Sequence, residues 1–98
     1  MFKPSGERRA VAEDGCCIQL EGLSRVVLVE DGIEYVARTE PLAEDPAGDG
    51  LRVDAASLRV AVNCCFQAPV PPEETARVMH RLAEGLAVLG IRPRFRGL

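Results

Sequence analysis

The stretch RVVLVEDGIEYVAR, residues 25–38, constrains the possible folds of this chain more than any other part of it. Two runs rich in β-branched residues flank Asp31-Gly32, and a two-residue Asp-Gly loop favours a type I′ β-hairpin. Counting outward from the turn predicts three cross-strand pairs: Glu30 with Ile33, Leu28 with Tyr35, and Val26 with Ala37. We expect the core face of the hairpin to carry Val26, Leu28, Ile33, Tyr35 and Ala37. The other face then carries Arg25, Val27, Val29, Glu34, Val36 and Arg38.

Alternating apolar residues indicate further strands before and after this hairpin. In residues 16–20, every second residue is apolar and lies on one side: Cys16, Ile18 and Leu20. In residues 58–66, the residues on one side are also all apolar: Leu58, Val60, Val62, Cys64 and Phe66. Between them, residues 39–50 contain two prolines and four acids and predict a loop.

The last third of the chain predicts a helix followed by a strand. Residues 72–90 begin with Pro72, which suits the first helical position, and Gly90 suits a C-terminal cap. The apolar stripe of this helix consists of Val78, Met79, Leu82, Leu86 and Leu89. Residues 91–96 alternate again, and Pro93 predicts an edge strand because proline cannot donate a ladder hydrogen bond. A right-handed crossover would make this strand parallel to the one before the helix.

These elements predict a two-layer α+β domain. We expect a mostly antiparallel sheet of four to five strands, one C-terminal helix packed on one face, and a final edge strand. Residues 1–14 are polar and aperiodic and predict a flexible N-terminal arm, so residues 15–98 form the single domain.

Composition limits the classes of protein to which the chain can belong. It has 98 residues, 47% of them hydrophobic, without the roughly 20 consecutive apolar residues that span a bilayer. The N-terminus has no apolar run after its basic residues, so we expect no secretory signal and a reducing, cytoplasmic location. The net charge of −3 argues against nucleic acid as the partner.

All four cysteines occur in two doublets, Cys16-Cys17 and Cys64-Cys65. Adjacent strand residues point to opposite faces, and zinc sites leave two to four residues between paired cysteines, so we expect no metal site. The alternation assigns Cys16 and Cys64 to the core and leaves Cys17 and Cys65 as candidate reactive thiols. If their two strands are neighbours, Cys17 lies near Cys65. The alternative is that all four are small apolar side chains.

Arg92, Arg94 and Arg96 lie on one side of the last predicted strand and are candidate anion-binding residues. The alternative is a solvated edge whose charges prevent strand-to-strand aggregation. His80, the single histidine, falls on the polar side of the helix, away from the thiols. We therefore identify no catalytic residues and expect no cofactor.

One helix covers one face of a sheet and leaves the other open, with Val27, Val29, Val36 and Cys65 on it. A partly apolar open face is typical of an association surface. The leading hypothesis is a small cytoplasmic protein-interaction or regulatory domain without catalysis, a homodimer through this face or an edge strand, or bound to another protein. Two alternatives remain: a thiol-based redox or metal-binding protein using Cys17 and Cys65, and an anion or nucleic-acid binder using Arg92, Arg94 and Arg96.

Overall fold

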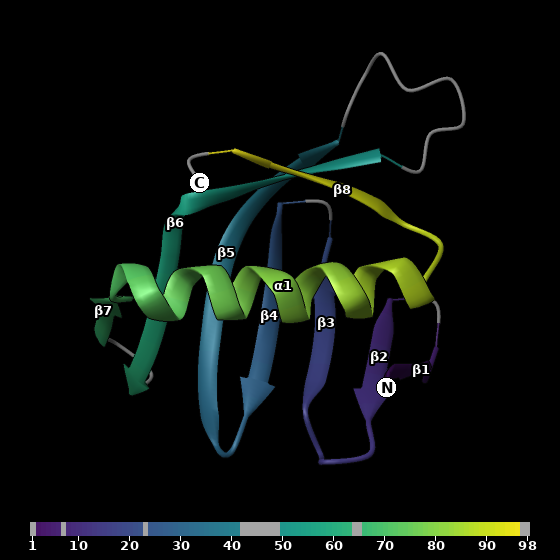
Figure 1. Cartoon of the computed structure of the whole chain (residues 1–98), viewed down its shortest axis with the longest axis horizontal. Coiled ribbons are helices and arrows are strands. Elements are labelled where there is room, and N and C mark those ends of the chain that lie inside the picture. Colours follow the sequence, from purple (N-terminus) through teal and green to yellow (C-terminus); the bar gives the residue numbers. More distant parts are fainter. Residues whose placement is uncertain (1, 7, 23, 42–49, 64–65, 97–98) are drawn as a thin grey trace.

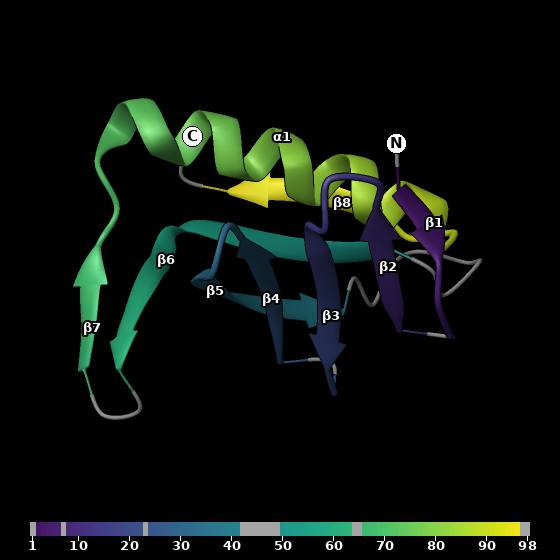
Figure 2. The same ribbon diagram turned by 90° about the horizontal axis from the view of Figure 1, so that it is seen from below.

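The computed structural model describes residues 2–6, 8–22, 24–41, 50–63 and 66–96 as one curled sheet with a helix lying across it (Figure 1). The elements in chain order are β1 (Phe2–Pro4), β2 (Arg9–Ala12), β3 (Cys17–Glu21), β4 (Arg25–Glu30), β5 (Ile33–Pro41), β6 (Gly50–Asn63), β7 (Phe66–Pro69), α1 (Pro72–Val88) and β8 (Arg92–Arg96). The strand order is β1-β2-β3-β4-β5-β6-β7, and β8 pairs with β6. From the side, α1 and β8 lie on the same side of the curled sheet (Figure 2).

The predicted fold class is therefore wrong in its sheet. Within the described residues the sheet has eight strands and is curled, whereas the sequence predicted a two-layer sheet of four to five strands. Two of the added strands, β1 and β2, have three and four residues, too few to show a repeating apolar pattern. Another difference is β6, a single strand of 14 residues that begins eight residues before the strand predicted from Leu58.

The N-terminal residues form strands where the sequence analysis expected a flexible arm. Phe2, Ala10 and Ala12 are buried in the same core as the helix. The guanidinium of Arg81 on α1 lies 5.2 Å from the centre of the Phe2 ring, close enough for a cation–π contact. These contacts hold β1 and β2 against the end of the sheet.

The predicted hairpin is confirmed with its register. Glu30 pairs with Ile33, Leu28 with Tyr35, and Val26 with Ala37. Asp31 and Gly32 have φ angles of 52° and 77°, the positive values that a type I′ turn requires. The core placement is confirmed for Val26, Leu28, Tyr35 and Ala37. It is wrong for Ile33, which is 45% exposed because the turn extends beyond the part of the sheet that α1 covers (Figure 1).

The helix packs on the sheet through a stripe of buried residues: Val78, Met79, Leu82, Gly85 and Leu86. Gly85 allows a close approach to β3, because a β-carbon there would lie 2.1 Å from Cδ1 of the buried Ile18. Gly90 follows the helix with a φ of 78°, which confirms the predicted glycine cap.

The long strand β6 pairs with different partners along its two halves. Residues Gly50–Asp54 pair in parallel with β8, and Arg59–Asn63 pair antiparallel with β7. The predicted parallel strand after the helix is thus present, although it pairs with the first half of β6. Each strand at an edge of the described sheet, β1, β7 and β8, contains a proline: Pro4, Pro69 and Pro93. Proline at an edge discourages pairing with another chain.

Candidate functional site

The sheet face opposite the helix presents its side chains in rows across neighbouring strands. One row joins Val11, Cys17 and Val29, which are direct partners across β2, β3 and β4. The next row joins Val27 and Val36 across β4 and β5. We call these five residues the valine patch. Because directly opposed residues share a face, they form one continuous, partly apolar surface.

Three of the residues predicted for an interaction face therefore come together. Val29 is 37% exposed and Val36 is half-buried, whereas Val27 is 8% exposed and forms the floor of the patch. Cys17, predicted as a reachable thiol, lies half-buried in the patch and accepts a hydrogen bond from Arg9 Nε at 3.2 Å. Cys64 and Cys65 lie outside the described residues. The predicted proximity of Cys17 to Cys65 required β3 and β6 to be neighbouring strands. They are not neighbours, because β4 and β5 lie between them.

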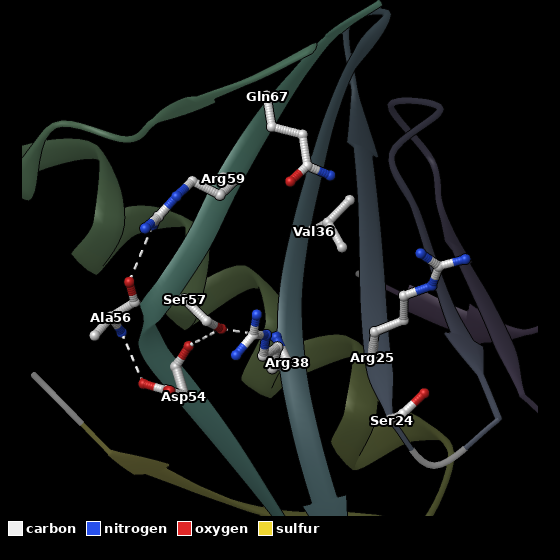
Figure 3. Close-up of a pocket in the computed structure, with 9 residues that line it drawn as sticks. All are labelled: Ser24, Arg25, Val36, Arg38, Asp54, Ala56, Ser57, Arg59 and Gln67. Carbon is white, nitrogen blue, oxygen red and sulfur yellow. Dashed lines mark hydrogen bonds between the residues drawn. The ribbon is translucent and has the colours of Figure 1, made fainter. Parts of the chain in front are cut away.

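A pocket of about 620 Å³ lies on the same face, toward the end where β3 turns into β4 (Figure 3). Its lining consists of Ser24, Arg25, Val36, Arg38, Asp54, Ala56, Ser57, Arg59 and Gln67. We call it the arginine pocket. With three arginines and one aspartate, its lining carries a formal excess of two positive charges.

An irregular stretch of β6 shapes the pocket. Val36 pairs with Arg59 and Arg38 pairs with Asp54, so four residues of β6, 55–58, lie opposite the single residue Ala37. Hydrogen bonds hold this excursion: Asp54 Oδ1 accepts from the Ala56 amide at 3.0 Å, and Ser57 Oγ donates to the Asp54 carbonyl at 2.7 Å. The Arg38 amide in turn donates to Ser57 Oγ at 2.7 Å, which joins the excursion to β5. One wall of the pocket is therefore the backbone of β6, held in place by the side chains of Asp54 and Ser57.

The three arginines of the pocket differ in what they contact. Arg25 Nε lies 2.6 Å from Oε1 of Glu21, a residue that does not line the pocket. Arg59 Nη1 donates to the carbonyls of Ala56 and Leu58 at 3.0 and 2.8 Å, and Figure 3 shows the side chain turned toward Ala56. The guanidinium of Arg38 makes no hydrogen bond or ion pair with any described residue. Arg38 is thus the free cation of the pocket within the described part of the chain.

A smaller hollow of about 380 Å³ adjoins the arginine pocket and shares Ser24, Arg38 and Asp54 with it. Arg96 lines this hollow, and so does Arg52, whose Nη1 lies 2.7 Å from Glu40 Oε1. Of the predicted anion-binding residues, Arg92 and Arg94 are exposed on β8 but line neither cavity. The three arginines predicted as a set therefore divide between a cavity and an open edge.

The helix side of the sheet holds a second group of charges around Arg81. Its Nη2 lies 2.9 Å from Asp14 Oδ2, and its Nε lies 3.5 Å from Glu30 Oε2, an ion pair without hydrogen-bond geometry. Arg77 contacts both Glu30 and Glu74. Burial raises the pKa of the Cys16 thiol, which is 1% exposed, and the neighbouring Arg81 only partly opposes that rise. The group joins the helix to the sheet, while burial keeps Cys16 a neutral thiol.

The remaining candidates add no reactive arrangement to the part of the chain that the structure describes. The side chain of His80 is 78% exposed, with Nε2 3.3 Å from Glu84 Oε1. Within the described ranges, no group of three or more His, Cys, Asp or Glu side chains is placed to hold a metal ion. The one described helix, α1, lacks the length and apolar character needed to cross a bilayer.

Comparison of the chain with protein-family models, with curated proteins and with solved structures finds no match. Its function must therefore be inferred from the residues of the open face. Sequence reasoning missed the arginine pocket, although one signal for it was present. The predicted hairpin register already placed Arg25 opposite Arg38, and directly opposed like charges destabilise a sheet unless something compensates them.

Proposed function

We propose that this chain is a non-catalytic protein-interaction domain that pairs with a second copy of itself through the open sheet face. The observation that carries the proposal is the row Val11, Cys17 and Val29, whose side chains are in register and partly exposed on the face opposite α1. An apolar centre surrounded by charged residues is the usual organisation of a protein–protein interface.

The position of the charges favours a second copy as the partner. Beside the patch, one cross-strand row contains both acidic and basic side chains: Glu21, Arg25, Arg38, Asp54 and Arg96. A surface with both signs can be complementary to itself about a twofold axis. The molecule measures 37 × 29 Å along its two longest axes, so this face is large enough for the roughly 800 Å² per partner of a standard interface.

The edges of the sheet are less suitable for pairing. Pro4, Pro69 and Pro93 each remove a backbone donor from an edge strand, and Arg92, Arg94 and Arg96 add charge along β8. We therefore place the interface on the face and not on an edge. A reducing compartment such as the cytoplasm suits the proposal, because Cys16 and Cys17 are free thiols.

The test compares two exposed residues near the same hairpin turn that lie on opposite faces. Val29, 37% exposed, is on the open face, and Ile33, 45% exposed, is on the helix side. Sedimentation velocity at about 100 µM protein, well above micromolar dissociation constants, should show a dimer for the wild type and for Ile33→Glu. Val29→Glu should be a monomer, because a carboxylate would be buried without a partner. A monomeric wild type, or equal effects of the two substitutions, would refute the proposal.

Cys17 offers a second readout of the same interface. In a Cys64→Ser, Cys65→Ser background, a short bismaleimide should link two copies through Cys17 if the valine patch faces its symmetry mate. Cys16 is 1% exposed and should not react. Linkage that persists in the Val29→Glu variant would indicate random collision and count against the interface.

A further inference from the structure

We infer that the arginine pocket binds the oxyanion group, a carboxylate or a phosphate, of a small organic molecule. This site is distinct from the valine patch, which lies toward the hairpin turn, although the two share Val36. The inference does not depend on self-association.

The first observation is that the fold leaves a cation uncompensated at this place. Arg25 and Arg38 are direct cross-strand partners, an arrangement that repels. Glu21 neutralises Arg25 from one side, at 2.6 Å, but no described residue neutralises Arg38. An anion bound beside Arg38 would remove the repulsion that the apo protein contains.

The second observation is that the nearby acid does not fulfil this role in the structure. Asp54 pairs directly with Arg38 across the strands, yet its Oδ1 accepts the Ala56 amide and stabilises the excursion of β6. Ser57 is likewise occupied, since its hydroxyl both accepts from the Arg38 amide and donates to the Asp54 carbonyl. These bonds fix the backbone of Arg38 while leaving its guanidinium available, which is the preorganisation that favours binding.

The third observation concerns size and chemistry. A cavity of about 620 Å³ falls within the range that takes small organic ligands, roughly 300–1,000 Å³. Val36 provides an apolar floor, and Ser24 and Gln67 add polar groups at the rim (Figure 3). Guanidinium groups match carboxylate and phosphate oxygens through paired donors. The combination suits a small ligand with one oxyanion group and a short apolar or polar body.

Nucleic acid fits the same charges less well. The residues that line the pocket include no aromatic side chain on which a base could stack, and Asp54, Glu21 and Glu40 interrupt the arginines on this face. The whole chain also carries a net charge of −3. A pocket of this size with an excess of two positive charges is better matched to a small anion than to a long polyanion.

The test is a titration of the purified protein with inorganic phosphate and, separately, with succinate, followed by amide chemical shifts and calorimetry at constant ionic strength. We expect saturable shifts at Arg38, Ser57 and neighbouring amides. Arg38→Gln should bind the probe roughly tenfold or more weakly than the wild type. Arg38→Lys, which keeps the charge but not the paired donors, should have an affinity between those of the wild type and Arg38→Gln. Arg94→Gln is the matched control, since Arg94 is also an exposed strand arginine but lines neither cavity.

Each outcome decides between ligand classes or against the site. Binding of phosphate alone identifies a phosphate ester, binding of succinate alone identifies a carboxylate ligand, and binding of both supports a general oxyanion site. No saturable binding of either probe, equal binding by Arg38→Gln, or equal loss in Arg94→Gln would overturn the inference. Repeating the titration on the Val29→Glu variant separates it from the proposed dimer, because the pocket should bind equally well in the monomer.

A stability measurement excludes a trivial loss of binding through misfolding. Without ligand, Arg38→Gln should unfold at the same temperature as the wild type or at a higher one, since the substitution removes the repulsion from Arg25. Phosphate or succinate should raise the midpoint of the wild type and leave that of Arg38→Gln unchanged. A variant that is less stable without ligand would show that Arg38 serves the fold, which contradicts its role as a ligand-binding cation.

Discussion

The two faces of the sheet differ in whether every arginine in the charge cluster has a carboxylate partner. On the helix side, Arg77 and Arg81 are paired with Glu30, Glu74 and Asp14. On the open side, Arg25 and Arg52 are paired with Glu21 and Glu40, but the guanidinium of Arg38 has no partner among the described residues. The cysteine doublet shows the same contrast, because Cys16 is buried under the helix while Cys17 is half-buried in the valine patch.

This contrast separates charges that stabilise the fold from charges that remain for a ligand. Where an arginine already has carboxylates at about hydrogen-bond distance, its role is accounted for by the packing of the helix. Where the fold holds the backbone of an arginine and leaves its guanidinium without a carboxylate, no ion pair with a described residue accounts for the charge. The open face is therefore where function should be sought.

The largest expected effect tests the contrast at two consecutive residues of β4. Leu28 is fully buried on the helix side, and Val29 is 37% exposed on the open side. Leu28→Ala should lower the free energy of unfolding by about 2–5 kcal/mol, through lost burial and the cavity it leaves. Val29→Ala should cost less than about 1 kcal/mol, as surface substitutions do. Urea denaturation at low protein concentration measures both. Equal losses there would mean that the open face is covered within one copy.

A smaller loss of stability is expected from adding a side chain at Gly85, where the helix approaches β3 closely. Gly85→Ala improves helix propensity by up to about 1 kcal/mol, but its β-carbon would overlap Ile18 Cδ1 at 2.1 Å. Overpacking of this kind costs about 1–3 kcal/mol, so we expect a net loss. Adding Ile18→Val removes the clashing methyl, and thermal unfolding should show that the double variant recovers stability relative to Gly85→Ala. Additive losses would indicate that the two residues do not meet.

The sequence predicted the local parts of this structure and missed those that depend on distant contacts. The hairpin register follows from Asp31-Gly32 alone, and the helix follows from its own periodicity and glycine cap. The exposure of Ile33 depends on how far α1 extends across the sheet, which no local pattern records. The strands β1 and β2 are too short to be recognised and are held by contacts such as Phe2 with Arg81.

The candidate site divides in the same way. The outward placement of Val29, Val36, Arg25 and Arg38 was predicted, because a two-residue turn determines which side chains share a face. The pocket was not, because it requires the excursion of β6 at residues 55–58 and the side-chain hydrogen bonds of Asp54 and Ser57. A polar sequence such as that around Asp54 can make a turn, a strand or a bulge, and only the pairing with β5 selects among them.

The smallest expected effect concerns Asp14, the exposed end of the helix-side charges. The hydrogen bond from the Cys16 amide, and then the Arg81 guanidinium, hold the pKa of Asp14 below its ordinary value of 3.8. A carboxyl group with a lowered folded pKa contributes stability above its unfolded pKa, and that contribution is lost as the pH falls through the folded pKa. The difference in unfolding free energy between wild type and Asp14→Asn should therefore be largest near neutral pH and shrink below about pH 4.

The side chain of Asp14 is 59% exposed, so its ion pair with Arg81 is weakened by solvent and the difference will be modest even near neutral pH. Urea denaturation from pH 7 down to about pH 2 covers the window in which the carboxyl titrates. Glu13→Gln is the matched control, because the neighbouring carboxylate makes no ion pair with any described residue. A pH-independent difference for Asp14→Asn would show that the side chain acts by shape and not by charge. The pairing of charges on the helix side would then contribute as little to stability as the unpaired Arg38 does on the open side.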